Sequence, residues 1–295
     1  MIRVLEEHQV GQVDIPVGGH ADLSTAEHAA VAVFNRNGTL PPLILIRSWA
    51  KELGKLGRLA DLLGEDQPVY AIGPPRHDRH DEYPDTVDEW AKFYLPVFAS
   101  LELDGPLLMG GWSFGGVIAL RMADMLAERG PEVRLIVMLD SRIPNPHPKE
   151  ERTTAHKVIH HINQAMGMER ASRAPYLRER ARRQLNRAVS WARELLGLRQ
   201  QGRHVSSNPK KDPLTRAIWV AYLKFIPQVS AIPVAQFACL PSVEHVCDLA
   251  LGWTPFLRGD LETVVVPGEH MTMFEAPHVE VLAQRIRRTL ARTRI

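Results

Sequence analysis

The residues in this chain best suited to chemistry are a serine and its neighbours, Gly111-Trp112-Ser113-Phe114-Gly115. An apolar run, Pro106 to Met109, precedes the motif, and a helical pattern from about Phe114 to Arg129 follows it. Gly-x-Ser-x-Gly between a strand and a helix is the context of a nucleophile elbow, a sharp turn that exposes the serine hydroxyl. The helix N-terminus supplies N–H groups where an oxyanion would form. Although the motif also arises by chance in glycine-rich turns, its flanks predict acyl transfer by Ser113.

Such a serine needs a general base, and the base needs an orienting acid. On α/β-hydrolase folds these residues follow the chain order serine, acid, histidine. His270 comes shortly after the last apolar strand pattern, Leu261 to Val266, where the histidine of this fold belongs. The other histidines lie in polar segments or in a basic helical stretch, and we expect most of them to be solvated. His270 is therefore the predicted base.

Asp140 is the leading candidate for the acid. It ends the strand pattern Leu135 to Leu139, at the same predicted sheet edge as Ser113, although an aspartate there also suits a turn. The competing position follows the strand pattern Pro233 to Cys239, where many hydrolases of this fold place their acid. In that region Glu244 is the runner-up and Asp248 lies further along. We favour Asp140.

Around these residues the sequence shows short apolar strand patterns that alternate with amphipathic helical patterns. This rhythm predicts a mostly parallel sheet with helices on both faces. Together with the elbow motif it favours the α/β-hydrolase fold. Asn37-Gly38 predicts a hairpin turn between the first two strands, and Pro96 predicts a kink or an early end in its helix. The further strand patterns are Ala29 to Phe34, Leu43 to Ile46 and Pro68 to Ile72, and the helical patterns are Trp49 to Leu63, Thr86 to Leu101 and Pro277 to Arg292.

The chain divides into a leader and one large domain. Residues 1–28 are polar without a sustained period and predict a leader or linker with at most a short strand. Residues 29–295 predict a single domain. Between about residues 142 and 227 three prolines are followed by a basic helical block without a clear strand, and strands then resume. This block is predicted to be an insertion into the sheet.

Composition places the chain among ordinary globular proteins. It has 295 residues, 45% hydrophobic and 24% charged, with a formal net charge of +2. Its two cysteines, Cys239 and Cys247, give neither a disulfide framework nor metal-ligand spacing, so we expect no metal and no cofactor. The N-terminus lacks the apolar core of a signal peptide, and no stretch approaches the length of a membrane span. These features predict a cytoplasmic protein with no membrane partner.

Several segments in order resemble the thioesterase domains that end nonribosomal peptide and polyketide synthases. The elbow alone is shared with every lipase and esterase, whereas the ordered combination is far more specific. The resemblance runs from about Ala29 to Leu290 and is weakest over the insertion. The segments that carry it are Gly110 to Ala119, Leu139-Asp140-Ser141, Asp248 to Trp253, Val266 to Met273, and Pro277-His278-Val279.

The resemblance implies a mechanism and a partner. It implies that the insertion at about residues 142–227 is a lid over an acyl chamber, and that Ser113, Asp140 and His270 form the triad. Ser113 would attack a thioester on the phosphopantetheine arm of an acyl or peptidyl carrier protein. Water, or an internal hydroxyl or amine, would then release the chain by hydrolysis or macrocyclisation. The oxyanion would receive backbone N–H groups from Phe114 and from Trp49, in the loop after Leu43 to Ile46.

The oxyanion loop departs from the family. Relatives usually carry a His-Pro-x-Gly-Gly-like run there, whereas this chain has Arg47-Ser48-Trp49-Ala50-Lys51. Losing one oxyanion donor costs about 10²–10³ in rate, so the change is consistent with an unusual acyl group, slow turnover or a degraded enzyme.

Basic residues of the insertion have two interpretations. They could steer an acidic carrier protein or simply be a solvated helix face. Nucleic-acid binding is disfavoured because no aromatic residues interleave with these arginines in a recognised module. The residues in question are Arg178, Arg180, Arg182, Arg183 and Arg187.

The sequence therefore leaves four candidate functions. A carrier-dependent releasing thioesterase is favoured; the alternatives are a type II editing thioesterase, an esterase of small free esters, and an inactive binding protein that keeps the fold. Epoxide hydrolase and dehalogenase chemistry is disfavoured, because it needs a carboxylate at the elbow position that Ser113 occupies.

Overall fold

The structure is a computed structural model that describes residues 12–15, 31–49, 52–74, 83–103, 105–127, 130–143 and 213–293. Most of the predicted leader and of the predicted lid lies outside these residues, as do the five arginines considered for carrier docking. Ala50 and Lys51 of the oxyanion loop also lie outside them.

One sheet organises the described residues, with strands in the order β1-β2-β4-β3-β5-β6-β7-β8. Every neighbouring pair is parallel except β2 and β4, which are antiparallel. The prediction of a mostly parallel sheet is confirmed. The strands are β1 Gln12–Ile15, β2 Val31–Phe34, β3 Leu43–Ile46, β4 Val69–Ile72, β5 Leu107–Trp112, β6 Val133–Leu139, β7 Val234–Cys239 and β8 Leu261–Val266.

The predicted hairpin between β2 and β3 is wrong. The chain does turn at Asn35–Gly38, where the Gly38 N–H donates to the Asn35 carbonyl at 2.9 Å. However, β4 lies between the two strands and pairs with both of them. The Asn35 side chain anchors this turn, because its amide donates to the carbonyls of Ala60 and Gly64 at the end of a helix. The turn therefore packs on a helix end and does not close a two-stranded ribbon.

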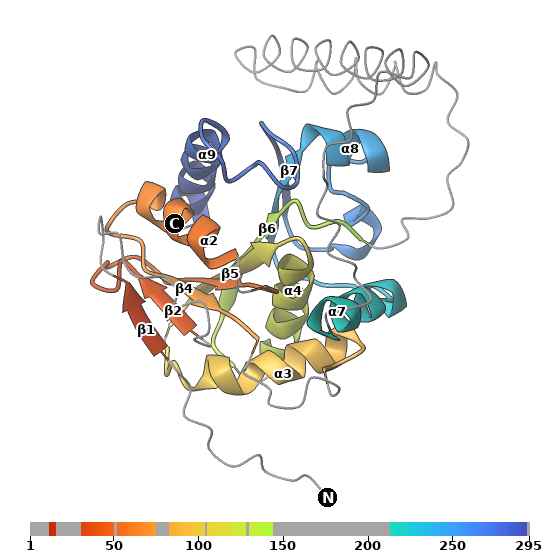
Figure 1. Ribbon diagram of the computed structural model, residues 1–295, viewed down its shortest axis with the longest axis horizontal. Helices are drawn as coiled ribbons and strands as arrows, with labels where there is room; N and C mark the ends of the chain where they lie inside the picture. Colours follow the sequence, from red (N-terminus) through yellow and green to blue (C-terminus); the bar gives the residue numbers. More distant parts are fainter. Residues whose placement is uncertain are drawn as a thin grey trace, which may run out of the picture. The chain divides into compact units, whose positions relative to one another are not determined.

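Helices cover both faces of the sheet (Figure 1). Alternate residues of a strand point to opposite faces, and two separate hydrophobic clusters follow from this alternation. Ile44 and Ile46 of β3 pack with α3, α4 and α7, whereas Leu43 and Leu45 pack with α2 and α9. The helices are α2 Leu53–Leu63, α3 Val87–Ala99, α4 Phe114–Leu126, α7 Pro213–Lys224, α8 Leu240–Val246 and α9 His278–Thr293, with a 3₁₀ turn, η2, at Thr254–Phe256.

The helices differ from their predicted limits by a few residues, as α2 and α3 illustrate. α2 begins at Leu53 and not at Trp49, because the loop before it is held by its own bonds: the Glu52 carboxylate accepts the Ser48 N–H at 2.8 Å. α3 begins after Thr86, whose hydroxyl accepts the Glu89 N–H as a helix cap. It continues through Pro96 and ends at Ala99, two residues before the predicted end at Leu101.

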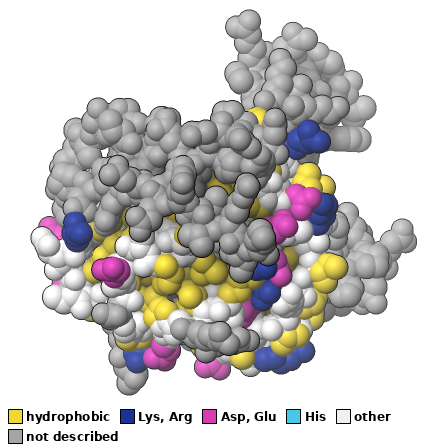
Figure 2. All heavy atoms as spheres, turned by 90° about the horizontal axis from the view of Figure 1, so that it is seen from below, with side chains coloured by type: hydrophobic (Ala, Val, Ile, Leu, Met, Phe, Trp, Pro, Cys, Tyr) yellow, Lys and Arg dark blue, Asp and Glu magenta, His cyan; other side chains and the backbone are white. Residues whose placement is uncertain are grey.

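Hydrophobic side chains also reach the surface, as Figure 2 shows for the face seen from below. Among the described residues, Trp219 and Leu223 of α7 are exposed, as is Ile226 after it. No helix in the described ranges is both long enough and apolar enough to cross a membrane.

Candidate active site

Ser113 lies at the turn between β5 and α4. Its backbone has φ 55° and ψ −120°, a region that non-glycine residues seldom occupy. The surrounding structure holds this conformation, since the Ser113 N–H donates to the Leu139 carbonyl of β6 at 2.9 Å. The side chain is half-buried at the carboxyl edge of the sheet. A strained serine fixed between a strand and a helix is the geometry that the elbow motif predicts.

The two motif glycines allow the chain to pass close to itself. A Cβ on Gly111 would lie 2.7 Å from the Gly116 backbone nitrogen, inside the first turn of α4. A Cβ on Gly115 would collide with the Ile46 carbonyl oxygen and lie 3.8 Å from the Ser48 hydroxyl. The second approach places the loop after β3 directly against the start of α4, where the predicted oxyanion hole would form.

Asp140 ends β6 and is completely enclosed. Its side chain has 0% exposure, yet both oxygens have partners. Oδ1 accepts the Cys239 N–H at 2.8 Å, and Oδ2 accepts the Ser242 hydroxyl at 2.7 Å. Oδ2 also lies 2.7 Å from His270 Nδ1. A buried carboxylate with three hydrogen-bond partners is fixed in position.

The two competing acids lie in different environments. The Asp248 carboxylate accepts the backbone N–H groups of Ala250 and Gly252 at 3.1 and 2.8 Å, so it organises the turn that leads into η2. Glu244 lies on the short helix α8. Among the described contacts of the His270 ring nitrogens, the carboxylate partner is Asp140.

His270 is supported by an aromatic ring and by its own loop. The Trp112 ring lies 5.2 Å from the imidazole at an interplanar angle of 36°. Lys55 of α2 places its ammonium 4.5 Å from the Trp112 ring centre and donates to the Met271 carbonyl at 3.0 Å. Because Trp112 immediately precedes Ser113, this packing brings the histidine beside the elbow. The imidazole remains 39% exposed and accessible to a substrate.

The predicted oxyanion donors lie on two segments that meet at Gly115. Phe114 is the first residue of α4, where N–H groups have no partner within the helix. The loop Arg47–Trp49 is anchored from several sides: the Tyr94 hydroxyl donates to the Arg47 carbonyl at 2.7 Å, and the Trp49 indole donates to the Thr215 hydroxyl at 3.2 Å. Burial raises the pKa of Tyr94 well above its usual value, which keeps the hydroxyl protonated as a donor. The role of the Trp49 backbone N–H stays a prediction.

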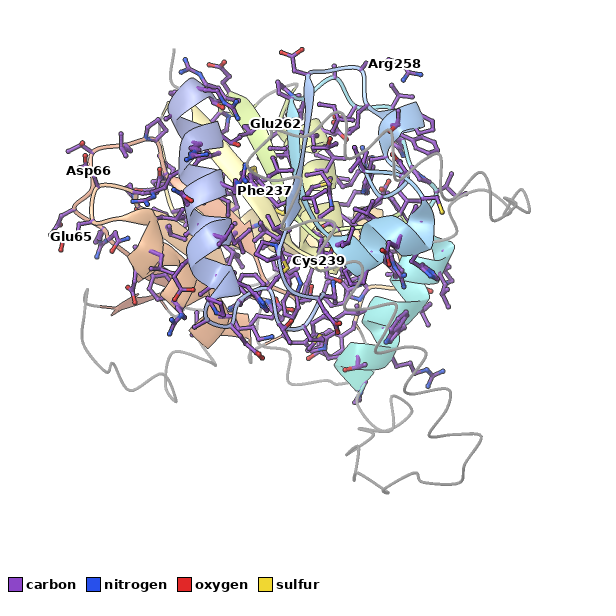
Figure 3. The ribbon with its side chains drawn as sticks, turned by 90° about the horizontal axis from the view of Figure 1, so that it is seen from above. Glu65, Asp66, Phe237, Cys239, Arg258 and Glu262 are labelled. Carbon is purple, nitrogen blue, oxygen red and sulfur yellow. The ribbon has the colours of Figure 1, made fainter. Side chains whose placement is uncertain are left out.

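Sequence reasoning missed the residues that support the acid and the base. Ser242 binds Asp140 from the segment considered only for Glu244, and the Cys239 N–H does so from the end of β7. Figure 3 shows Cys239 and Phe237 in the interior, whereas Glu65 and Arg258 lie at the periphery. Trp112 is part of the elbow motif, so the sequence did offer a signal that it lies beside the nucleophile. For Lys55 the sequence held none, because 216 residues separate it from Met271.

A serine at a strand–helix turn beside an acid–histidine pair, all at the carboxyl edge of a mostly parallel sheet, defines the α/β-hydrolase class. The family described as "Thioesterase domain" matches residues 58–290. Since this is most of the chain, the protein belongs to the thioesterase domain family and is a hydrolase.

Curated relatives include parts of large synthases. The non-reducing polyketide synthase ntnG of Nectria sp. is 26% identical over 238 residues, which cover 78% of this chain but 11% of that protein. "Thioesterase pynI" of Aspergillus niger is 32% identical over 144 residues, 45% of this chain and 44% of that one. The chain therefore spans only a small part of the synthases that it matches.

Solved structures support the same fold. The NocB thioesterase domain from a nocardicin cluster has a TM-score of 0.60 at 23% identity, covering 89% of this chain and 99% of that one. The Vlm2 thioesterase domain bound with a dodecadepsipeptide has a TM-score of 0.54 at 23% identity, covering 88% and 98%.

Proposed function

We propose that the protein is a serine thioesterase that releases an acyl or peptidyl chain from the phosphopantetheine arm of a carrier protein. The observation that carries the proposal is the buried Asp140 carboxylate bound to His270 beside the strained Ser113 turn. Family membership supports thioester chemistry, and relatives that are parts of synthases support a carrier-bound substrate.

The three side chains have distinct tasks. Ser113 Oγ attacks the thioester carbonyl carbon while His270 Nε2 accepts its proton. Asp140 holds Nδ1–H and stabilises the imidazolium. Collapse of the tetrahedral intermediate breaks the carbon–sulfur bond, and the leaving thiolate takes the proton from His270. The acyl-Ser113 ester is then attacked by water or by a hydroxyl or amine of the chain itself, with His270 again as base.

Backbone N–H groups of Phe114 and Trp49 would stabilise the oxyanion. The contact of the β3 loop with Gly115 supports this pairing, because it brings both segments to the same side of the elbow. Trp49 has no glycine neighbours to relax its backbone, but its loop is held by Tyr94, Glu52 and Thr215. An anchored loop keeps a donor aimed without glycine.

We further propose that the protein releases products and does not edit short acyl groups. About 85 residues separate Arg142 from Pro227, enough for a lid that encloses a long acyl chain. Enclosure would exclude bulk water and favour an internal nucleophile. The position of the acid at the end of β6 also matches the releasing domains that the sequence resembles.

A covalent probe tests the nucleophile. A fluorophosphonate should label the wild-type protein at Ser113, as mapped by peptide mass spectrometry. Ser113→Ala should not be labelled, while Ser100→Ala, an exposed serine at the end of α3, should react as the wild type does. Unlabelled wild-type protein would instead support an inactive binding protein.

A substrate comparison tests the reaction. Long multi-residue acyl-pantetheine thioesters should show a higher kcat/KM than acetyl-pantetheine, and a pantetheine analogue should compete. Equal or faster turnover of the short thioester would indicate an editing enzyme. Turnover of simple esters without competition by pantetheine would indicate a small-molecule esterase.

A further inference from the structure

An arginine and a tyrosine stand beside the proposed nucleophile without a role in the mechanism above. Arg142 follows Asp140 by two residues, and Tyr222 lies on α7. The Tyr222 ring packs edge-on against Phe114, with centroids 6.1 Å apart, and Phe114 immediately follows Ser113. The pair therefore lies between the start of the elbow helix and the strand end that carries the acid.

The backbone of Arg142 is fixed although its side chain is exposed. Its neighbours Ser141 and Ile143 are buried. The Ser141 carbonyl accepts the Trp253 indole N–H at 2.9 Å, and the Ile143 N–H donates to the Leu251 carbonyl at 3.1 Å. An exposed arginine whose backbone is held in place loses less conformational entropy when it binds a ligand than an arginine on a mobile loop does.

Tyr222 fixes the first part of the Arg142 side chain. The tyrosine hydroxyl donates to the Arg142 carbonyl at 3.0 Å and accepts from Nε at 3.3 Å. Arginine has five N–H donors, so this contact leaves the two terminal nitrogens. Among the residues that the structure describes, no carboxylate forms an ion pair with Arg142, and Asp140 is already bound to three donors. Burial raises the pKa of Tyr222, which keeps its hydroxyl protonated.

We propose that Arg142, oriented by Tyr222, binds an anionic oxygen group of the thioester substrate, a carboxylate or a phosphate. The planar fork of terminal nitrogens matches the paired oxygens of both groups. Two sources share this chemistry: a carboxylate on the acyl chain, and the phosphate of the phosphopantetheine arm. The inference rests on the proposed function, because it names a feature of the substrate of the same site.

Two matched substrate pairs distinguish the sources. One pair consists of acyl-pantetheine thioesters with a carboxylate or the isosteric carboxamide, placed at several distances from the thioester. The other pair carries the same neutral acyl group on pantetheine with or without its phosphate. The readout is the ratio of kcat/KM, anionic over neutral, in each pair. A hydrogen bond to a charged group predicts a ratio of about tenfold or more in the wild type.

Three variants connect that ratio to the two residues. Arg142→Gln should bring the ratio close to one, with the change mainly in KM, and Tyr222→Phe should lower it in part. Arg134→Gln removes a half-buried arginine near the opposite end of β6, where it pairs with Glu132, and should leave the ratio as in the wild type. If Arg142 only braces α7, its loss would slow both members of a pair equally and leave the ratio unchanged. That result, or a wild-type ratio of one in both pairs, would overturn the proposal.

Failure of the proposed function gives a different result. If the wild type cleaves no thioester, the function falls, and the anion site is tested by binding alone. Calorimetry with uncleavable pantetheine amides, as the same anionic and neutral pairs, should then show tighter anionic binding in the wild type and none of that preference in Arg142→Gln. Equal binding of both members would overturn the site as well.

Discussion

Replacing Asp140 by asparagine tests how the buried acid acts. The carboxylate accepts bonds from Cys239 N–H and Ser242 Oγ and contacts His270 Nδ1, all at 2.7–2.8 Å. An amide NH₂ cannot face the Cys239 N–H, because two donors would then meet. The NH₂ must therefore take the place of Oδ2 and donate toward His270. Nδ1 then becomes an acceptor, and the ring proton moves to Nε2.

That tautomer cannot accept a proton from Ser113. In a serine protease the same exchange lowers kcat about 10⁴-fold, and we expect a comparable loss here. A factor of 10⁴ corresponds to about 5.4 kcal/mol of transition-state stabilisation. The assay is thiol release from an acyl-pantetheine thioester, with the rate of fluorophosphonate labelling of Ser113 as a second readout. Circular dichroism melting checks that the variant folds.

The matched control is Glu244→Gln, which changes the same functional group at the competing position and should retain activity within a few-fold. Ser242→Ala keeps the charge and two of the three contacts of Asp140, so it should fall between the other two variants. The reasoning is refuted if Asp140→Asn stays within a few-fold of the wild type while Glu244→Gln loses orders of magnitude. The triad acid would then lie after β7.

Three further outcomes follow from named contacts. Ser113→Ala should abolish acyl-enzyme formation with little change in melting temperature, and an acyl adduct in its intact mass would reject Ser113 as the nucleophile. Gly115→Ala should fold poorly or melt far lower, because its Cβ would collide with the Ile46 carbonyl; wild-type melting would contradict the close approach. Lys55→Met should lower kcat several-fold and leave acyl-chain preference unchanged, because it frees Met271 and Trp112 beside His270; an unchanged kcat would mean that this link does not position the base.

The sequence indicated most of the fold through local pattern. β3 and β8 have the predicted limits, and α4 begins at the predicted Phe114. These elements are strongly periodic or bounded by glycine and proline, so their own residues suffice to define them. The elbow was recognisable for the same reason, since a strand, a strained serine and a helix are continuous in the chain.

Strand order did not follow from local pattern. Asn37-Gly38 has the composition of a hairpin turn and connects β2 to β3 in the chain. In the sheet, however, β4 lies between these two strands. Adjacent strands bury hydrophobic faces against helices that come later in the chain, and that gain in burial decides the pairing over the turn preference. The sequence alone does not show whether the turn preference or the burial of hydrophobic faces contributes more to the free energy of folding.

Residues that meet from distant parts of the chain depended entirely on tertiary structure. Sequence reasoning placed Asp140 and Glu244 as rivals, and only the 2.7 Å contact between Asp140 and His270 distinguishes their positions. Arg142 and Tyr222 are 80 residues apart and show no shared pattern. A motif describes residues that are close together in the chain. The residues that support a site are instead brought together by packing, and their spacing in the sequence does not indicate that they meet.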